Sequence, residues 1–234
     1  MTPDETSIRK AVRDHYSQLA QVGKRQGCCG PTPSEEDSVP SEASEVYDGC
    51  GSPIEAAEVK EGEIVVDLGS GGGFDVFRAS KLVGQNGRVI GVDATPEMVW
   101  RARETAKKYA FSNVEFRLGE IEHLPVDSNS VDVIVSNCVI NLAPEKGAVF
   151  REAHRILRPG GRLVVSDTVA ECTLKVDRKD LGVWAECSAG ALPEDDYLNL
   201  INKAGFVNVE VGTKTQSCCS QGIASITVTA TKPK

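Results

Sequence analysis

Cysteine is the side-chain type in this sequence with the widest chemistry. The 234 residues include eight cysteines, which form two vicinal pairs but no C-x-x-C, so the spacing of a zinc ribbon is absent. The N-terminal residues lack the apolar core of a signal peptide, and because the cytosol keeps thiols reduced, we do not expect a disulfide scaffold. Thiolates select soft, thiophilic ions. The candidate thiols are Cys28, Cys29, Cys50, Cys138, Cys172, Cys187, Cys218 and Cys219.

A glycine-rich loop with two aspartates forms a second group. Asp67-Leu68-Gly69-Ser70-Gly71-Gly72-Gly73 follows a β-branched run, and Asp93 ends the next one. At the carboxyl ends of parallel strands, such glycines let a ligand approach the backbone, and the second acid accepts hydrogen bonds from ribose hydroxyls. A dinucleotide loop would have its third glycine at Phe74, and Asp67 would repel a pyrophosphate. The pattern therefore favours a nucleoside cofactor that carries a cationic amino acid.

The elements that position these residues alternate along the chain. Strands are predicted at 63–68, 87–93, 113–118, 131–137 and 161–167, with helices at 73–83, 95–109 and 144–157 between them. Thr95 and Pro96 are typical of a helix start. A helix at 4–22 precedes this region, and a helix at 193–204 with strands at 206–212 and 223–231 follows it. This alternation predicts an α/β fold, a Rossmann-like doubly wound and mostly parallel sheet.

Composition divides the chain into three segments. Eight acids and no Lys or Arg lie between Gln26 and Val59, and the other 26 acids balance all 26 bases. Residues 27–51 are rich in Gly, Pro, Ser and Glu, which predicts a mobile linker. We expect residues 1–51 to form a helix and this cysteine-bearing linker, 52–170 the cofactor-binding core, and 171–234 a substrate-binding segment with the last strands of the sheet.

Charge and hydropathy exclude several kinds of partner. No apolar run approaches the roughly 18 residues of a membrane helix, and the balanced body offers no cationic surface to nucleic acid. A composition of 40% hydrophobic and 26% charged residues is ordinary for a globular protein. We expect a soluble cytoplasmic monomer without membrane or nucleic-acid partners.

The loop and its acidic partner resemble the class I S-adenosylmethionine (SAM) methyltransferases. The resemblance implies that Asp67 and the Gly69–Gly73 loop hold the methionine part, Asp93 the ribose, and Glu120 with Ile121 the adenine. For Glu120, a solvated loop acid is the alternative. The full set of implied cofactor residues is Asp67, Gly69, Ser70, Gly71, Gly73, Asp93, Met98, Glu120, Ile121 and Asn137.

Cys138 directly follows the fourth predicted strand, in Ser-Asn-Cys-Val-Ile-Asn-Leu, which predicts a position beside the transferable methyl group. Alone, it would be read as a small buried hydrophobe. The N-P-P-Y signature of enzymes that methylate amines is missing at this point, and none of the three histidines stands where a general base is expected. A substrate with its own lone pair would need no base.

Five segments together resemble arsenite methyltransferases. They are DGCGSP (48–53), DLGSGGGFD (67–75), SNCVINL (136–142), AVFREAHRILRPGG (148–161) and ECSAGAL (186–192), and the resemblance covers about residues 46–212. It implies that Cys50, Cys138 and Cys187 bind trivalent arsenic, whose lone pair attacks the methyl group. It also implies a reductant such as thioredoxin or glutathione, arsenite or its glutathione conjugate as substrate, a role in detoxification, and no metal cofactor.

The remaining cysteines have lesser expected roles. Cys28 or Cys29 would relay electrons to the site, Cys172 would be structural, and the pair Cys218 and Cys219 could deliver arsenic or be spare exposed thiols. Tyr16 and its helix resemble a cover over SAM. Two other functions stay open: a SAM-dependent methyltransferase for a small organic molecule, and a sensor that binds a metalloid or zinc without catalysis.

Overall fold

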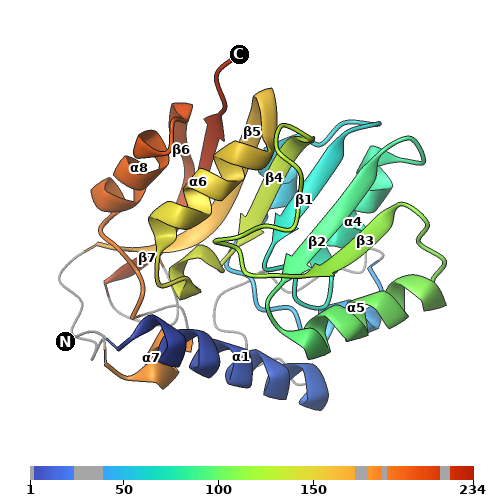
Figure 1. Cartoon of the computed structure of the whole chain (residues 1–234), viewed down its shortest axis with the longest axis horizontal. Helices are drawn as coiled ribbons and strands as arrows, with labels where there is room; N and C mark the ends of the chain where they lie inside the picture. Colours follow the sequence, from blue (N-terminus) through green and yellow to red (C-terminus); the bar gives the residue numbers. More distant parts are fainter. Residues whose placement is uncertain (1–2, 24–38, 172–178, 186–188, 217–221) are drawn as a thin grey trace.

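One seven-stranded sheet forms the middle layer of the protein, as the computed structural model shows (Figure 1). The structure describes residues 3–23, 39–171, 179–185, 189–216 and 222–234. Its strands are β1 (Ile64–Leu68), β2 (Arg88–Asp93), β3 (Val114–Leu118), β4 (Val131–Asn137), β5 (Leu157–Ala170), β6 (Val207–Gln216) and β7 (Ile223–Thr231). They lie in the order β3-β2-β1-β4-β5-β7-β6.

The first five strands are parallel, and only β7 runs antiparallel to its neighbours β5 and β6. Parallel strands require crossover connections, and the helices between them provide these. The strand order reverses between β1 and β4, where the carboxyl ends of parallel strands usually receive a ligand. The predicted doubly wound, mostly parallel α/β sheet is confirmed.

Helices cover both faces of the sheet. One face packs against α3 (Pro53–Ala57), α4 (Phe74–Val83) and α5 (Pro96–Lys108), and the other against α6 (Lys146–Ile156) and α8 (Glu194–Lys203). The strand residues alternate between the two cores: Val65, Val89 and Val133 face the first group, and Val66, Ile90 and Ile134 the second. Burial on both faces explains why these strands are almost continuously apolar.

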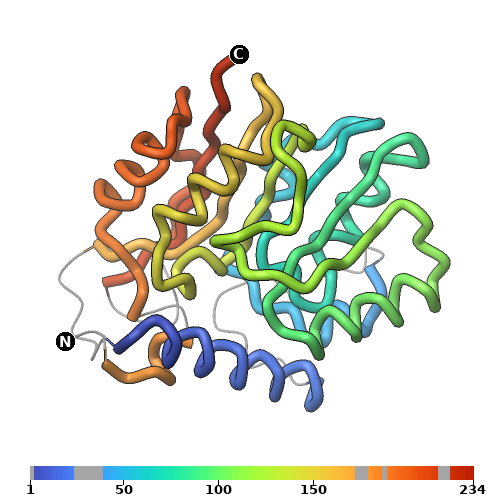
Figure 2. The backbone as a smooth tube through the Cα atoms, in the orientation of Figure 1, coloured from blue at the N-terminus to red at the C-terminus, as the bar shows by residue number. Residues whose placement is uncertain are grey.

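Two helices far apart in the sequence lie side by side at the carboxyl edge of the sheet (Figure 2). They are α1 (Glu5–Val22), with the Asp4 side chain accepting from Ser7 N at its start, and α7 (Leu181–Ala185). Ile8 of α1 packs with Trp184 and Ala189. These helices therefore close the end of the sheet at which β1, β2 and β4 terminate.

The expectation of a mobile linker over 27–51 is wrong for its described part, residues 39–51. These residues contain a short helix, α2 (Ser41–Ser44), and bury Ala43, Val46 and Tyr47. A Cβ atom at Gly72 would lie 2.4 Å from Val46 Cγ2, which shows how closely this segment packs on the glycine loop. A few apolar residues spaced through an acidic stretch are enough to order it.

Two further details differ from the expected elements. The strand expected at 161–167 extends over Leu157–Ala170, because Leu157 already pairs with Val131 before Gly160 interrupts the ladder with a φ of 81°. A 3-10 turn, η2 (Ile140–Leu142), follows β4 before α6 begins. Within the described ranges, no helix combines the length and apolarity that crossing a membrane requires.

Candidate active site

The loop between β1 and α4 brings its backbone to the carboxyl end of the sheet. Gly69, Gly71 and Gly73 have φ values of 68°, 49° and 93°, a region that favours glycine. A Cβ at Gly69 would lie 2.3 Å from Val139 Cγ2, and one at Gly73 2.7 Å from Phe116 Cζ. At Gly71 the same position has no described atom within 4 Å. Gly69 and Gly73 thus permit close packing, and Gly71 presents its backbone to open space.

Asp93, the last residue of β2, fixes this loop. Its Oδ2 accepts a hydrogen bond from Gly71 N at 2.8 Å, and its Oδ1 accepts one from Thr95 N at 2.8 Å. Burial raises the pKa of Asp93, and the two N–H groups partly offset that rise by stabilising the carboxylate. Asp93 therefore orders the loop and also lines the cavity beside it.

Two more buried aspartates line the same cavity. Burial, and then the charges of Asp75 and Asp93, raise the pKa of Asp67 well above its usual range. Burial likewise raises the pKa of Asp75 to about 6, although Asn137 Nδ2 and the Arg78 guanidinium favour its ionised form. A positively charged ligand would relieve this repulsion. The electrostatics of the cavity therefore favour a cation.

The cavity contains about 1010 Å³ of empty space, part of it open to solvent. Ser70 Oγ is buried there without a hydrogen-bond partner among the described residues, so a ligand could supply one. Gly73, by contrast, is the N-cap residue of α4 and packs against Phe77 and Phe116. The other nine predicted cofactor residues all line the cavity: Asp67, Gly69, Ser70, Gly71, Asp93, Met98, Glu120, Ile121 and Asn137.

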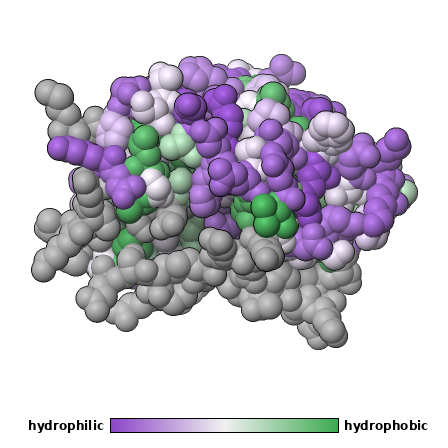
Figure 3. Space-filling view, turned by 90° about the horizontal axis from the view of Figure 1, so that it is seen from below, coloured by the Kyte–Doolittle hydropathy of each residue, from purple (hydrophilic) through white to green (hydrophobic). Residues whose placement is uncertain are grey.

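Helix α1 forms a wall of this cavity through Arg9, Val12, Arg13 and Tyr16. Two ion pairs join it to the loop after β3: Arg9 Nη2 to Glu122 Oε1 at 2.9 Å, and Arg13 Nη2 to Glu120 Oε1 at 3.0 Å. The carboxylate predicted to contact adenine is thus engaged by Arg13. On the side of the molecule where α1 lies, hydrophilic side chains dominate the described surface and hydrophobic ones show in patches (Figure 3).

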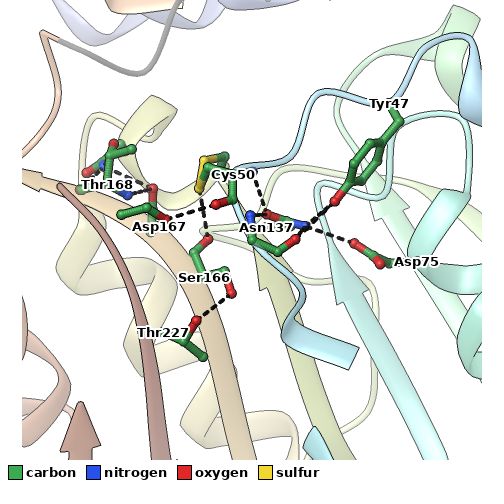
Figure 4. The surroundings of a disulfide bond; sticks show 12 residues. Tyr47, Cys50, Asp75, Asn137, Ser166, Asp167, Thr168 and Thr227 are labelled. Atoms are coloured by element: carbon green, nitrogen blue, oxygen red, sulfur yellow. Dashed lines mark hydrogen bonds between the residues drawn. A yellow bond between two sulfur atoms is a disulfide. The ribbon is translucent and has the colours of Figure 1, made fainter. Parts of the chain in front are cut away.

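Two of the three predicted arsenic ligands meet beside the cavity. Cys50 and Cys138 form a disulfide, with Cα atoms 5.8 Å apart, and both are buried (Figure 4). Cys138 follows the last residue of β4 with a φ of 54°, unusual for a residue other than glycine, and its N–H donates to Ser166 O at 2.8 Å. Cys138 also lines the cavity. The disulfide therefore adjoins the cavity.

The third predicted ligand, Cys187, lies outside the described residues, as do Cys28, Cys29, Cys172, Cys218 and Cys219. The residues that flank Cys187 in the sequence are held on η2. Trp184 Nε1 donates to Leu142 O at 3.1 Å, and a Cβ at Gly190 would lie 2.0 Å from Asn141 O. Lys146 Nζ donates to Asn141 O at 3.1 Å and lies over the Trp184 ring. These contacts place both flanks near the turn that follows Cys138.

Sequence reasoning missed several residues of this site. Asp75 stands two positions after Gly73, and that spacing at a helix start was the available signal. Tyr47, whose hydroxyl accepts from Asn137 Nδ2 at 2.8 Å, lay in the segment expected to be mobile. Arg9 and Arg13, at i and i+4, share one face of α1, but no local pattern shows which carboxylates they pair with.

The chain is similar to known methyltransferases. A family model described as a methyltransferase domain matches residues 59–205. Among curated relatives, the arsenite methyltransferase of Halobacterium salinarum is 44% identical over 92% of this chain and 61% of its own length. That of Aquipseudomonas alcaligenes is 38% identical over 86% of this chain and 62% of its own length. The chain thus spans about three fifths of these relatives.

A solved structure of an arsenic methyltransferase is similar to this chain. The crystal structure of an arsenic(III) S-adenosylmethionine methyltransferase from Chlamydomonas reinhardtii superposes with a TM-score of 0.70 at 35% sequence identity. The match covers 87% of this chain and 74% of the algal one.

Proposed function

Because the chain belongs to the methyltransferase-domain family and, within it, to the arsenite methyltransferases, we propose that it methylates trivalent arsenic with SAM as methyl donor. The observation that carries the proposal is the position of Cys138. This residue lines the same cavity as Asp67 and Asp93 and lies within disulfide distance of Cys50. A thiolate at that point can hold a thiophilic substrate next to a bound cofactor.

The cavity residues suit SAM, which supplies an electrophilic methyl group on a sulfonium when it is bound. Asp67 and Asp75 offer buried negative charge to a cationic amino acid, and the Gly69–Gly71 backbone lets that part approach closely. Asp93 can accept hydrogen bonds from ribose hydroxyls. Met98 and Ile121 provide apolar surface for the base, and Arg13 keeps Glu120 at that wall.

On the substrate side, arsenite or its glutathione conjugate exchanges its ligands for the thiolates of Cys50, Cys138 and Cys187. Three sulfur ligands would leave the arsenic pyramidal, with its lone pair free to form a bond to the methyl carbon while the bond from that carbon to the sulfonium sulfur breaks and S-adenosylhomocysteine leaves. No general base is required, so the protein contributes chiefly proximity and orientation. The contacts that fix the flanks of Cys187 on η2 support its inclusion. In this proposal residues 1–51 and 171–234 bring thiols to the core formed by 52–170.

Methyl transfer formally oxidises arsenic from the trivalent to the pentavalent state. Two cysteine thiolates can return the two electrons by forming a disulfide, and the Cys50–Cys138 bond supports this pair as the donor. Thioredoxin or glutathione would then reduce the disulfide by thiol exchange, and Cys28 or Cys29 would relay electrons to it. The biological outcome would be arsenic detoxification in the cytoplasm by a monomer.

The test is direct detection of product. The reduced full chain is incubated with SAM, arsenite and glutathione, and arsenic species are separated by chromatography with arsenic-specific detection. We expect methylated arsenic from the wild type and from Cys172→Ser, a cysteine outside the proposed ligand set. Unmethylated arsenic alone, from a chain that binds SAM, would overturn the proposal and indicate an organic acceptor.

A further inference from the structure

The side chain of Asn137 is enclosed by the segment that carries Cys50, here called the Cys50 strap (residues 47–51). Asn137 Oδ1 accepts from the backbone N–H groups of Cys50 at 3.0 Å and Gly51 at 3.2 Å. Asn137 Nδ2 donates to Tyr47 Oη at 2.8 Å and to Gly51 O at 2.9 Å. Both ends of one amide therefore bind the strap (Figure 4).

The strap closes tightly around this amide. Tyr47 Oη donates back to Gly51 O at 3.1 Å. A Cβ at Gly49 would lie 2.6 Å from Asn137 Nδ2, and one at Gly51 would lie 2.7 Å from Ser166 Oγ. Glycine at position 49 therefore lets the strap approach Asn137, and glycine at position 51 lets it approach Ser166 on β5. The conformation of the strap is thus shaped to this side chain.

Asn137 is also joined to both halves of the site. It directly precedes Cys138, and its Nδ2 donates to Asp75 Oδ2 in the cofactor cavity at 3.2 Å. Cys50 is held from the other side, where Ser225 Oγ donates to Cys50 O at 3.0 Å. Asn137 therefore holds the backbone of Cys50 opposite Cys138, the residue that follows Asn137 in the chain.

We propose that Asn137 is a positioning residue that holds Cys50 where its sulfur meets that of Cys138, and so sets how readily the two thiols close to a disulfide. The inference deepens the proposed function, in which this pair returns electrons to arsenic. Its basis is proximity: a thiol fixed beside its partner has a high effective concentration, which is lost when its segment is released.

An amide both donates and accepts hydrogen bonds, whereas a carboxylate only accepts them, so a carboxylate at position 137 could not hold the strap in the same way. Asn137→Asp could still accept from Cys50 N and Gly51 N, but it could not donate to Tyr47 Oη, Gly51 O or Asp75. It would also add a negative charge beside the buried Asp75. Asn137→Ala would leave the two N–H groups of the strap without their acceptor.

The test measures the thiol–disulfide equilibrium of the full chain in glutathione redox buffers. As the pair oxidises, Cys50 and Cys138 lose two electrons and two protons, and one glutathione disulfide gains them to give two glutathione thiols. Differential alkylation and peptide mass spectrometry report this pair separately from the other cysteines. We expect Asn137→Asp and Asn137→Ala to lower the equilibrium constant by about tenfold or more, and Tyr47→Phe to lower it by a smaller factor.

Asn113→Asp is the matched control. Asn113 Nδ2 donates to the carbonyls of Ser80 and Gly84. Asn113 directly precedes β3, whereas Cys138 follows the end of the parallel strand β4, so the same substitution removes similar bonds at the opposite end of the sheet. We expect its equilibrium constant to stay within about twofold of the wild type. Unchanged constants in all three test variants, or an equal fall in Asn113→Asp, would overturn the inference. The assay contains neither SAM nor arsenite, so its result stands apart from the proposed activity.

Discussion

Asp67 and Asp75 are buried in a cavity that they share with a third carboxylate, Asp93. Such an arrangement destabilises the ligand-free chain, because each charge has lost water and faces another of the same sign. A bound cation would turn the same charges into a source of affinity. At the scale of single residues, the same carboxylates are therefore expected to lower the stability of the ligand-free chain and to raise its affinity for a cation.

Replacing Asp67 by Asn tests this opposition. The variant keeps the shape of the side chain but removes one buried charge, so we expect the unfolding temperature of the ligand-free chain to rise and the affinity for SAM to fall about tenfold or more. Calorimetric scanning and titration measure the two effects. Asp132→Asn, at the opposite end of the strands, should leave SAM affinity unchanged. A lower unfolding temperature with unchanged SAM affinity in Asp67→Asn would contradict the proposal that Asp67 binds the cationic part of SAM.

The raised pKa values predict a pH dependence with a definite sign. In the ligand-free chain the pKa of Asp75 is about 6, above its ordinary value of 3.8, so the folded chain holds this proton more tightly than the unfolded chain does. The stability of the ligand-free chain should therefore fall as pH rises from about 4 to about 6. A cation prefers the ionised carboxylate, so SAM affinity should rise between pH 5 and pH 7.

Titration calorimetry in buffers of different ionisation enthalpy checks this prediction. Binding near pH 6 should release protons, and affinity should fall by up to about tenfold per pH unit below 6 for each carboxyl group that must ionise. Asp75→Asn should release fewer protons. Equal affinity at pH 5 and pH 7 without proton release would show that these carboxyl groups do not sense the ligand.

The sequence predicts these residues unevenly. Asp67 and Asp93 could be predicted because strand ends and glycine spacing mark them locally. Asp75 looks like an ordinary acid in the first turn of a helix, and its hydrogen bond comes from Asn137, 62 positions away in the sequence. The same holds for Tyr47, whose role follows from a contact with a residue 90 positions away.

At the scale of elements, helix α1 forms one wall of the cavity and is joined by two ion pairs to the loop after β3. The Arg9–Glu122 pair is largely buried, with side-chain exposures of 25% and 3%, whereas Arg13 and Glu120 are 47% and 35% exposed. Removing one partner of a buried pair leaves the other charge uncompensated, and exposed pairs contribute little. The Arg9–Glu122 ion pair should therefore contribute more to the docking of α1 than the Arg13–Glu120 pair does.

We expect Arg9→Gln to accelerate SAM dissociation by about three- to tenfold, and Arg13→Gln by about twofold or less. Stopped-flow displacement with S-adenosylhomocysteine gives the rates. Lys10→Gln, an exposed position on the same helix, serves as the control and should match the wild type. Equal effects of all three substitutions would show that SAM dissociation depends on the general stability of α1 and not on its two ion pairs.

The spacing of apolar residues predicts α1 as a helix, but not the place where it docks. Its ionic partners lie 107 and 113 residues away, and only the folded sheet brings them close. Residues 39–51 show the converse error, because an acidic composition suggested mobility where Ala43, Val46 and Tyr47 are buried. Local composition does not report long-range packing.

At the scale of the whole molecule, alternating strands and helices predict a parallel sheet with its ligand site at the carboxyl ends. The pattern does not give the order of strands. In particular, β7 enters between β5 and β6 and runs antiparallel to both, an arrangement set by pairing between distant segments. The fold is shared by many chemistries, so the thiols beside the cavity carry the argument for arsenic.

A single-turnover assay with methyl-labelled SAM tests whether Cys138 and Cys187 hold arsenic beside the methyl donor. It is run with reduced thiols and arsenite on wild type, Cys138→Ser, Cys187→Ser and Cys172→Ser. We expect arsenite-dependent transfer of label in wild type and Cys172→Ser, and a loss of about a hundredfold or more in the other two, since each removes a proposed ligand that orients the substrate. Full transfer by Cys138→Ser, or transfer that does not depend on arsenite, would show that these thiols do not hold the substrate.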